Sequence, residues 1–279
     1  MKSTIQKKLY VFVLMTFFLN TLLMATGPRV STLATVIDKN EIFALDLPPY
    51  ISTEVAEGGI LSEVIKAAFN EVKMEVQITI VPLQNMIKYY YAQENAPGFM
   101  GRHLGLSPKK KSTLVKVPLF VAGENYFYYK PLHPKGLEFK GKLSNLVGLT
   151  YGAAKGEDTT AYKNANIKVK KSRTLSFFKK LKNGTIDFIS IPKESVQWFL
   201  EKRLSDDKDN FVMMKEGSTN IDLCIYFNMN NPKGKKMLGA FKKGLKSILE
   251  NGKYATILEK HFKKDEVQLQ IKQIRKNIK

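Results

Sequence analysis

The groups best suited to chemistry lie in loops between predicted strands and helices, and they favour binding of a small polar molecule. Ala154 and Lys155 precede a predicted helix, whose free N–H groups and positive dipole end would attract a carboxylate or a phosphate. Gly105 and Ser107 offer a backbone N–H and a hydroxyl to an anion in another loop. Tyr50 follows two prolines, and its ring would either stack on a ligand or cover the core.

Motifs for catalysis or metal binding do not accompany these groups. His103, His133 and His261 are far apart and lack the i, i+4 spacing or nearby cysteines of a zinc site. The sequence contains no G-x-S-x-G elbow, no Walker loop and no G-x-G-x-x-G fingerprint. We therefore expect neither a metal nor a cofactor. Cys224, the only cysteine, lies in the apolar run 221–227, which indicates a buried hydrophobic side chain.

The N-terminus has the composition of a secretory signal peptide, which we place at residues 1–34. Three lysines among the first eight residues precede the almost uncharged, apolar run Leu9–Ala25. This run has about 17 residues, whereas a transmembrane helix usually needs about 20, but a membrane anchor remains the alternative. Thr32 and Ala34 fit the −3 and −1 positions of a cleavage site, and Leu23–Ala25 fits them less well. Because no cysteine lies near either position, we expect a periplasmic protein without a lipid anchor.

The chain is unusually basic, with a net charge of +20. Four basic residues and no acidic ones lie within residues 1–34, and +20 less four leaves about +16 for the mature chain. Such a charge could indicate acidic ligands, an anionic membrane surface or nucleic acid. The lysines, however, are scattered along the chain in the pattern of solvated helix faces, and the export signal also disfavours nucleic acid. We therefore expect no nucleic-acid partner.

Hydrophobic periodicity predicts an α/β protein. Apolar residues repeat at i, i+3, i+4 and i+7 over residues 60–72, as in a helix with one buried face, and they alternate over 76–80, as in a half-buried strand. With a strand at 41–45, this β-α-β order implies a parallel sheet covered by helices. Further strands are predicted at 115–130, 146–150, 167–169, 186–191 and 221–229, and further helices at 83–93, 174–183, 193–202, 235–251 and 253–263.

The long strands at 115–130 and 221–229 would each cross between two halves of the molecule. The expected architecture is two α/β lobes joined by two hinge strands, with a ligand cleft between them, where ligands preferentially bind. We place lobe 1 at residues 35–124 and 228–264 and lobe 2 at 125–227. Residues 265–279 would form a basic C-terminal tail, for which a frayed helix is one possible conformation.

Five short motifs occur in the order in which one known family carries them. The chain resembles the family 3 extracellular solute-binding proteins, the polar-amino-acid-binding components of ABC importers, over roughly residues 40 to 264. The motifs are Pro48–Tyr50 followed by Gly58–Gly59; Gly105–Lys111, where the family has a T-x-T-x-E-R loop; Val147–Gly152 at the start of the second lobe; Asn183–Asp187, which matches the family's G-x-x-D; and Glu250–Phe262, which resembles the family's NG-x-Y-x-x-I-x-x-K-x-F ending.

The resemblance implies a periplasmic-binding-protein-like II fold and further ligand-binding residues. Lys110 takes the place of an Arg that pairs with the ligand carboxylate; a lysine attracts an anion but lacks the bidentate fork, and the alternative is a solvated loop. The family holds the ligand ammonium with an acidic residue in the last loop of lobe 2. Here Pro192 is nearest to that position and Glu194 is displaced by two, which makes an ordinary α-amino acid a weaker candidate. Trp198 is interpreted as packing beside Phe199.

The function expected from these patterns is capture of a small polar, amino-acid-like or anionic solute by closure of the lobes. A monomer of this kind would present its ligand to ABC permease subunits at the inner membrane. One alternative is a sensory or orphan binding protein without a transporter. The other is an enzyme such as a dehydratase on the same scaffold. It would need a general acid or base, for which Glu57, Glu194 and His103 are the candidates, each without a visible partner. We expect no enzymatic activity.

Overall fold

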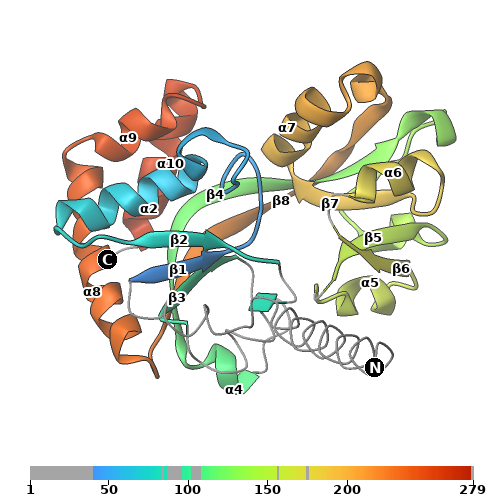
Figure 1. Ribbon diagram of the computed structural model, residues 1–279. Helices are drawn as coiled ribbons and strands as arrows, with labels where there is room; N and C mark the ends of the chain where they lie inside the picture. The colour runs from blue at the N-terminus through green and yellow to red at the C-terminus, as the bar shows by residue number, and fades with distance from the viewer. Residues whose placement is uncertain are drawn as a thin grey trace, which may run out of the picture. The chain divides into compact units, whose positions relative to one another are not determined.

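The computed structural model describes residues 40–82, 85–86, 96–101, 108–155, 157–173 and 176–277 (Figure 1). The side chains at positions 108, 110, 217 and 218 lie outside this description. Residues 40–279 form one compact unit. The predicted signal peptide and most of the helix predicted at 83–93 lie outside the described residues. Among the described helices, none combines the length and apolar character needed to cross a bilayer.

The described strands form a single sheet in the order β2-β1-β3-β8-β4-β7-β5-β6. Pairing is parallel at both ends of the sheet, among β1, β2 and β3 and among β5, β6 and β7, and antiparallel in the middle, where β4 and β8 run side by side. The strands are β1 (Glu41–Ala44), β2 (Gln77–Ile80), β3 (Gly98–Gly101), β4 (Leu114–Tyr129), β5 (Thr150–Ala154), β6 (Lys168–Ser172), β7 (Phe188–Pro192) and β8 (Phe211–Asn228).

Helices surround both ends of this sheet (Figure 1). The β1–β3 end carries α2 (Ile60–Glu71), α8 (Pro232–Glu250), α9 (Lys253–Leu258) and α10 (Lys264–Asn277). The β5–β7 end carries α5 (Thr160–Asn164), α6 (Phe177–Lys182) and α7 (Lys193–Arg203). The remaining short elements are α4 (Pro108–Lys111), η3 (Ala56–Gly58), η5 (Lys130–Leu132), η6 (Leu143–Leu146) and η8 (Ser205–Asn210). The predicted α/β class is confirmed.

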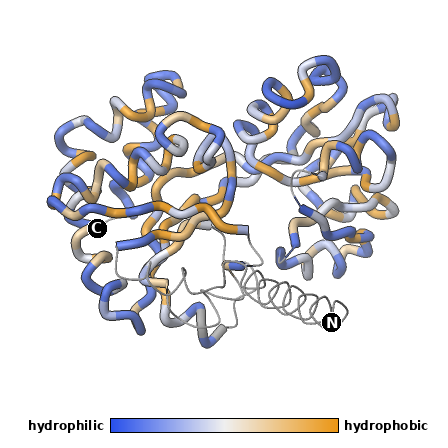
Figure 2. The backbone as a smooth tube through the Cα atoms, viewed as in Figure 1, coloured by the Kyte–Doolittle hydropathy of each residue, from blue (hydrophilic) through white to orange (hydrophobic). Residues whose placement is uncertain are grey.

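The two ends of the sheet have separate cores, which define two lobes. The core of lobe 1 joins α2, α8, α9 and α10 to the inner faces of β1, β3, β4 and β8. The cores of lobe 2 lie on either side of β4 and β7, one beneath α6 and α7 and the other around β5. Apolar residues accordingly concentrate on the strands and on the inward faces of the helices (Figure 2).

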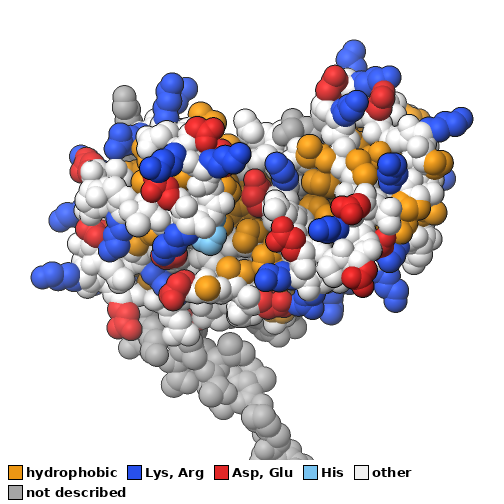
Figure 3. All heavy atoms as spheres, turned by 90° about the horizontal axis from the view of Figure 1, so that it is seen from above, with side chains coloured by type: hydrophobic (Ala, Val, Ile, Leu, Met, Phe, Trp, Pro, Cys, Tyr) orange, Lys and Arg blue, Asp and Glu red, His pale blue; other side chains and the backbone are white. Residues whose placement is uncertain are grey.

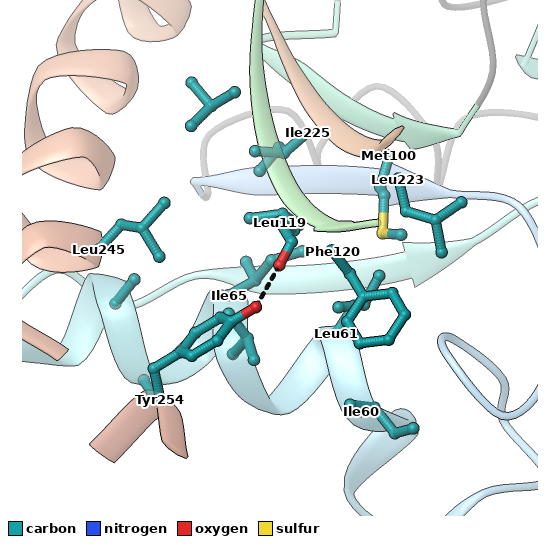
Figure 4. Close-up of a cluster of buried hydrophobic side chains, with 14 of the residues drawn as sticks. Ile60, Leu61, Ile65, Met100, Leu119, Phe120, Leu223, Ile225, Leu245 and Tyr254 are labelled. Carbon is teal, nitrogen blue, oxygen red and sulfur yellow. Dashed lines mark hydrogen bonds between the residues drawn. The ribbon is translucent and has the colours of Figure 1, made fainter. Parts of the chain in front are cut away.

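Tyr254 shows how the core of lobe 1 accommodates a polar atom. Its side chain is fully buried, and its hydroxyl donates a hydrogen bond to the backbone oxygen of Leu119 at 2.8 Å (Figure 4). Leu119 lies next to a register shift in the β4–β8 ladder, between Pro118 and Phe120. Burial raises the pKa of Tyr254 above its usual range, so the hydroxyl remains a donor. Helix α9 is thereby tied to the strand that leads into lobe 2.

Several predicted elements are confirmed within a few residues, but the strand predicted at 146–150 is wrong. Residues 143–146 form η6, and the strand begins only at Thr150. Val147 is 54% exposed, so its apolar side chain does not belong to a buried strand. The error arose because a short apolar run alone does not distinguish a strand from a tight turn that begins with a buried leucine.

Both the predicted second boundary of lobe 2 and the C-terminal tail need correction. Leu223, Ile225 and Phe227 pack in the core of lobe 1, so β8 has already entered that lobe well before residue 227. Residues 264–277 form α10, with Val267 and Ile274 fully buried in the same core. The composition suggested a tail because basic and other polar residues separate the few apolar ones, of which Val267 and Ile274 anchor the inner face of α10.

Helix α8 packs closely against α2 at Gly244. A Cβ atom at this position would overlap the backbone carbonyl of Ala68 in α2. The two helices therefore approach each other through a contact that only glycine permits. Gly239, on the exposed side of the same helix, has nothing within 4 Å of a Cβ atom.

We expect Gly244→Ala to destabilise the protein and Gly239→Ala to stabilise it. Overpacking at Gly244 should cost about 1–3 kcal/mol of unfolding free energy. At the exposed Gly239, alanine should contribute up to about 1 kcal/mol through its higher helix propensity. Urea denaturation of both variants checks this pair. Equal effects would contradict the helix contact.

Glu71, the last residue of α2, accepts hydrogen bonds from side chains of α8 and α9 and of the residue that caps α8. Its carboxylate accepts hydrogen bonds from Ser247 Oγ at 3.0 Å, Asn251 Nδ2 at 3.3 Å and Lys253 Nζ at 3.3 Å. The bond from Ser247 and then the one from Lys253 hold the pKa of Glu71 below its ordinary value of 4.5. The charged form is thus favoured in the folded protein.

A lowered pKa in the folded state means that Glu71 contributes stability above its unfolded pKa and loses this contribution as the pH falls through the folded value. We expect Glu71→Gln to lower the urea midpoint at pH 7, with the difference from the wild type disappearing in acid. The exposed Glu75→Gln serves as the control and should show no such convergence. A Glu71→Gln deficit that is constant with pH would contradict the assignment.

Candidate functional site

The candidate site lies where chain segments that follow strands of both lobes meet. Tyr50 belongs to the loop after β1, and Glu194 stands in the first turn of α7, directly after β7. In open sheets, ligands bind outside the carboxyl ends of the strands. Seen from above, acidic and hydrophobic side chains gather where the two lobes meet, and many Lys and Arg side chains project from the outer rim (Figure 3).

The loop that carries Tyr50 is held by the start of α2. The N–H of Ile60 donates to the carbonyl of Pro49 at 3.1 Å, and that of Leu61 donates to the carbonyl of Tyr50 at 2.8 Å. These bonds satisfy N–H groups that a helix start leaves unpaired. Gly59 makes the approach possible, because its φ of 97° suits glycine and a Cβ atom would lie within 2.7 Å of both carbonyl oxygens.

Tyr50 connects the lobes directly. Its ring is buried against Phe120 of lobe 1, with ring centroids 5.4 Å apart, and its hydroxyl donates to Glu194 Oε2 of lobe 2 at 2.7 Å. Burial, together with the negative charge of Glu194, raises the pKa of Tyr50 far above its usual range. The hydroxyl therefore stays protonated. In the described part of the chain, Oε1 of Glu194 accepts no hydrogen bond.

A second contact between the lobes lies closer to solvent. Arg203 Nη2, at the end of α7, lies 2.6 Å from both carboxylate oxygens of Glu54. The two side chains are 52% and 47% exposed, so water and salt screen the pair. We attribute much less stability to this pair than to the buried hydrogen bond between Tyr50 and Glu194.

The turn after β5 does not present the free N–H groups that the sequence suggested. The N–H of Ala154 donates to Oε2 of Glu157 at 2.9 Å, and the N–H of Lys155 donates to the carbonyl of Ser172 at 3.1 Å. The Lys155 side chain is exposed. Helix α5 starts at Thr160, within the predicted start at 158–160, and is five residues long, so its N-terminus does not directly follow the strand.

Three tyrosines line the inner side of this turn. The rings of Tyr151 and Tyr162 stack with centroids 4.0 Å apart, and the hydroxyls of Tyr162 and Tyr126 lie 3.1 Å apart. Tyr151 donates its hydroxyl hydrogen to Oε1 of Glu157 at 2.7 Å. Burial is the main cause that raises the pKa of all three tyrosines. The cluster therefore consists of three neutral hydroxyls, of which that of Tyr151 binds the Glu157 carboxylate.

The predicted ligand-binding residues thus have different outcomes. The structure brings Tyr50 and Glu194 together, while Ala154 and Lys155 use their N–H groups within the lobe. Lys110 lies in α4, but its side chain is outside the described residues, as are Gly105 and Ser107 entirely. For all seven residues, a role in ligand binding remains a prediction.

Sequence reasoning missed the roles of Glu157, Glu54 and Arg203. An acidic residue three positions after a strand end is a pattern that could have suggested Glu157 as a partner for the N–H groups there. No pattern along the chain pairs Glu54 with Arg203, because 149 positions separate them.

Two expectations about packing are confirmed. Trp198 is partly buried beside Phe199, with ring centroids 5.2 Å apart. Cys224 is 1% exposed, and burial raises the pKa of its thiol to about 11. Within the described ranges, no three His, Cys, Asp or Glu side chains are placed to hold a metal ion together.

Comparisons with known proteins agree on the architecture. The ligand-binding core of GluR0 from Nostoc punctiforme, in complex with L-glutamate, matches with a TM-score of 0.61 at 13% identity, covering 80% of this chain and 98% of that one. An ancestral arginine-binding protein bound to arginine matches with a TM-score of 0.62 at 18% identity, covering 81% and 99%. This chain has the fold of the amino-acid-binding proteins.

A third similar structure is the ancestral amino-acid-binding protein AncCDT-1, described as a precursor of cyclohexadienyl dehydratase. Its TM-score is 0.60 at 17% identity, and the match covers 84% of this chain and 100% of that one. No protein-family model matches the sequence, and no curated protein matches it. The two-lobed fold expected from the sequence is confirmed. The candidate site lies where side chains of its two lobes meet.

The buried contact between the lobes yields a direct prediction. Tyr50→Phe leaves Glu194 without its donor and should lower the unfolding free energy by about 1.5–3 kcal/mol, as for other hydrogen bonds to charged groups. Arg203→Ala should cost less than about 1 kcal/mol, because the ion pair is exposed. Urea denaturation of the ligand-free protein measures both. A Tyr50→Phe variant as stable as the wild type would show that the lobes are not joined there in solution.

Proposed function

We propose that this chain is a solute-binding protein that holds a small polar ligand between its two lobes. The observation that carries the proposal is the Tyr50–Glu194 hydrogen bond, which places a carboxylate from lobe 2 against a residue of lobe 1. The fold supports the proposal, because the structures it resembles include cores with glutamate or arginine bound. Closure of two lobes around a ligand is a hinge motion that two connecting strands permit.

Glu194 is the residue best placed to contact the ligand. One of its oxygens is held by Tyr50, so the carboxylate has a defined orientation. The other oxygen accepts no hydrogen bond from the described residues and is available to a donor on the ligand. If the ligand carries an anionic group, Lys110, Gly105 and Ser107 are the contacts proposed for it on the side of lobe 1, as predicted from the sequence.

The proposed function is import of a solute across a bacterial envelope by a binding protein that has itself been exported. The N-terminal sequence favours a cleaved signal peptide and a periplasmic protein, which would act as a monomer and deliver its ligand to ABC permease subunits. We propose no catalytic activity. The acid–base candidates Glu57 and Glu194 do not form a pair: Glu57 is exposed, and the described contact of Glu194 is a tyrosine that keeps its proton.

A ligand screen tests this function. The purified protein is heated with amino acids, amines, organic acids, sugars or phosphates, and its melting temperature is recorded. A ligand at a hundredfold excess over its Kd should stabilise the native state by about 2.7 kcal/mol. A protein whose melting temperature responds to none of these classes would contradict the proposal.

Glu194→Gln should then weaken binding of the hit by about tenfold or more, because the acceptor for Tyr50 is kept while the negative charge is lost. Glu201→Gln is the matched control, since Glu201 lies on the same helix, is exposed and accepts a hydrogen bond from the exposed Gln197. Isothermal titration calorimetry measures both. Equal weakening by the two variants would argue against a ligand contact at Glu194.

A further inference from the structure

The turn after β5 contains a complete carboxylate-binding position, and the chain fills it itself. The two oxygens of Glu157 each receive a strong donor, the hydroxyl of Tyr151 at 2.7 Å and the N–H of Ala154 at 2.9 Å. Donors on both oxygens are the arrangement by which proteins recognise a free carboxylate. A ligand carboxylate could occupy this position only if Glu157 left it.

The surroundings hold Glu157 in place. Its own N–H donates to the carbonyl of Ala154 at 3.1 Å, and its carbonyl accepts a hydrogen bond from Lys171 Nζ at 3.0 Å. Tyr151 is 1% exposed and stacked on Tyr162, so the hydroxyl that binds Glu157 has little freedom to turn elsewhere. The carboxylate is therefore part of the fold of lobe 2 and not a surface group that happens to lie nearby.

This filled position lies at the same edge of the sheet as Glu194. Strands β5 and β7 are parallel neighbours, with Tyr151 beside Phe188 and Gly152 beside Ile189. Their carboxyl ends therefore point in the same direction, one continuing to Glu157 and the other to Glu194. At this edge, lobe 2 directs a carboxylate oxygen of Glu194 to the ligand, whereas the backbone N–H of Ala154 already donates to Glu157.

We propose that Glu157 determines specificity: it excludes a ligand carboxylate from lobe 2 and restricts the cleft to amines that lack one, with the ammonium or guanidinium group bound by Glu194. This inference rests on the proposed function, because it names the ligand class of the same cleft. An α-amino acid would bring its carboxylate toward a wall whose own carboxylates repel it.

Matched pairs of compounds test the proposal, since agmatine and cadaverine differ from L-arginine and L-lysine only by the missing α-carboxylate. Titration calorimetry of the wild-type protein should show that at least one amine binds about tenfold or more tightly than its parent amino acid. A parent that binds as tightly as its amine would overturn the inference and leave the proposed function intact. Failure of every compound class to bind would overturn both.

Glu157→Ala should vacate the position and reduce or reverse the preference for the amine. Asp158→Ala is the matched control, because the hydrogen bonds of this neighbouring carboxylate go to Thr160, and the variant should leave the preference unchanged. A Glu157→Ala variant that keeps the full preference would overturn the proposal.

Acetate provides a second readout that does not depend on the ligand. It should raise the melting temperature of Glu157→Ala, by entering the vacated position, more than that of the wild type or of Asp158→Ala at equal ionic strength. Equal shifts in all three proteins would show that Tyr151 and Ala154 do not form a carboxylate-binding position.

Discussion

Strands β4 and β8 pair along almost their whole lengths, from Leu114 beside Asn228 to Tyr129 beside Phe211. Each strand contributes side chains to the cores of both lobes, so neither lobe is complete without the ladder. The ladder is interrupted near Phe120 and near Tyr126, where its register shifts. Such irregularities bend and twist a strand pair, and here they lie close to the passage from one core to the other.

This shared ladder brings together residues that lie far apart in the chain. Tyr50 and Glu194 are separated by 144 positions, yet each is fixed by a strand end only a few residues away. Tyr50 is further fixed by α2, whose first N–H groups bind the loop carbonyls. The hydrogen bond between the lobes is thus the product of rigid local supports on both sides, which is the arrangement that holds a binding group in a defined position.

The sequence predicted the elements whose side chains are buried at a regular period. Helix α2 and strand β4 match their predictions to within a residue or two, and α8 to within three, because one face of each packs on a core. Two predictions were wrong, the strand at 146–150 and the lobe boundary at 227. A short apolar run does not reveal whether its side chains are buried, or in which core. Residues 265–279 were assigned to a tail for the opposite reason, since the three buried residues Val267, Gln270 and Ile274 suffice to dock α10.

The candidate site was predictable in part. The family resemblance pointed to Tyr50 and Glu194, and the structure adds that they are hydrogen-bonded to each other. The sequence alone does not indicate that Glu157 binds back to the N–H of Ala154, because this contact depends on how the chain turns after β5 and on the hydroxyl of the buried Tyr151. Side chains that satisfy backbone groups locally leave little trace in a single sequence, since many polar residues near strand ends could do the same.

The discontinuity of lobe 1 has a consequence for the order of folding. Lobe 2 has its cores within residues 126–214, whereas the core of lobe 1 contains both Ile42 and Ile274. A chain that emerges from its N-terminus first therefore has all of lobe 2 before it has all of lobe 1. Helix α2 remains without its packing partners α8 and α9 until all of lobe 2 has appeared. Contacts over such sequence separations form slowly, because a long loop must close before they contribute.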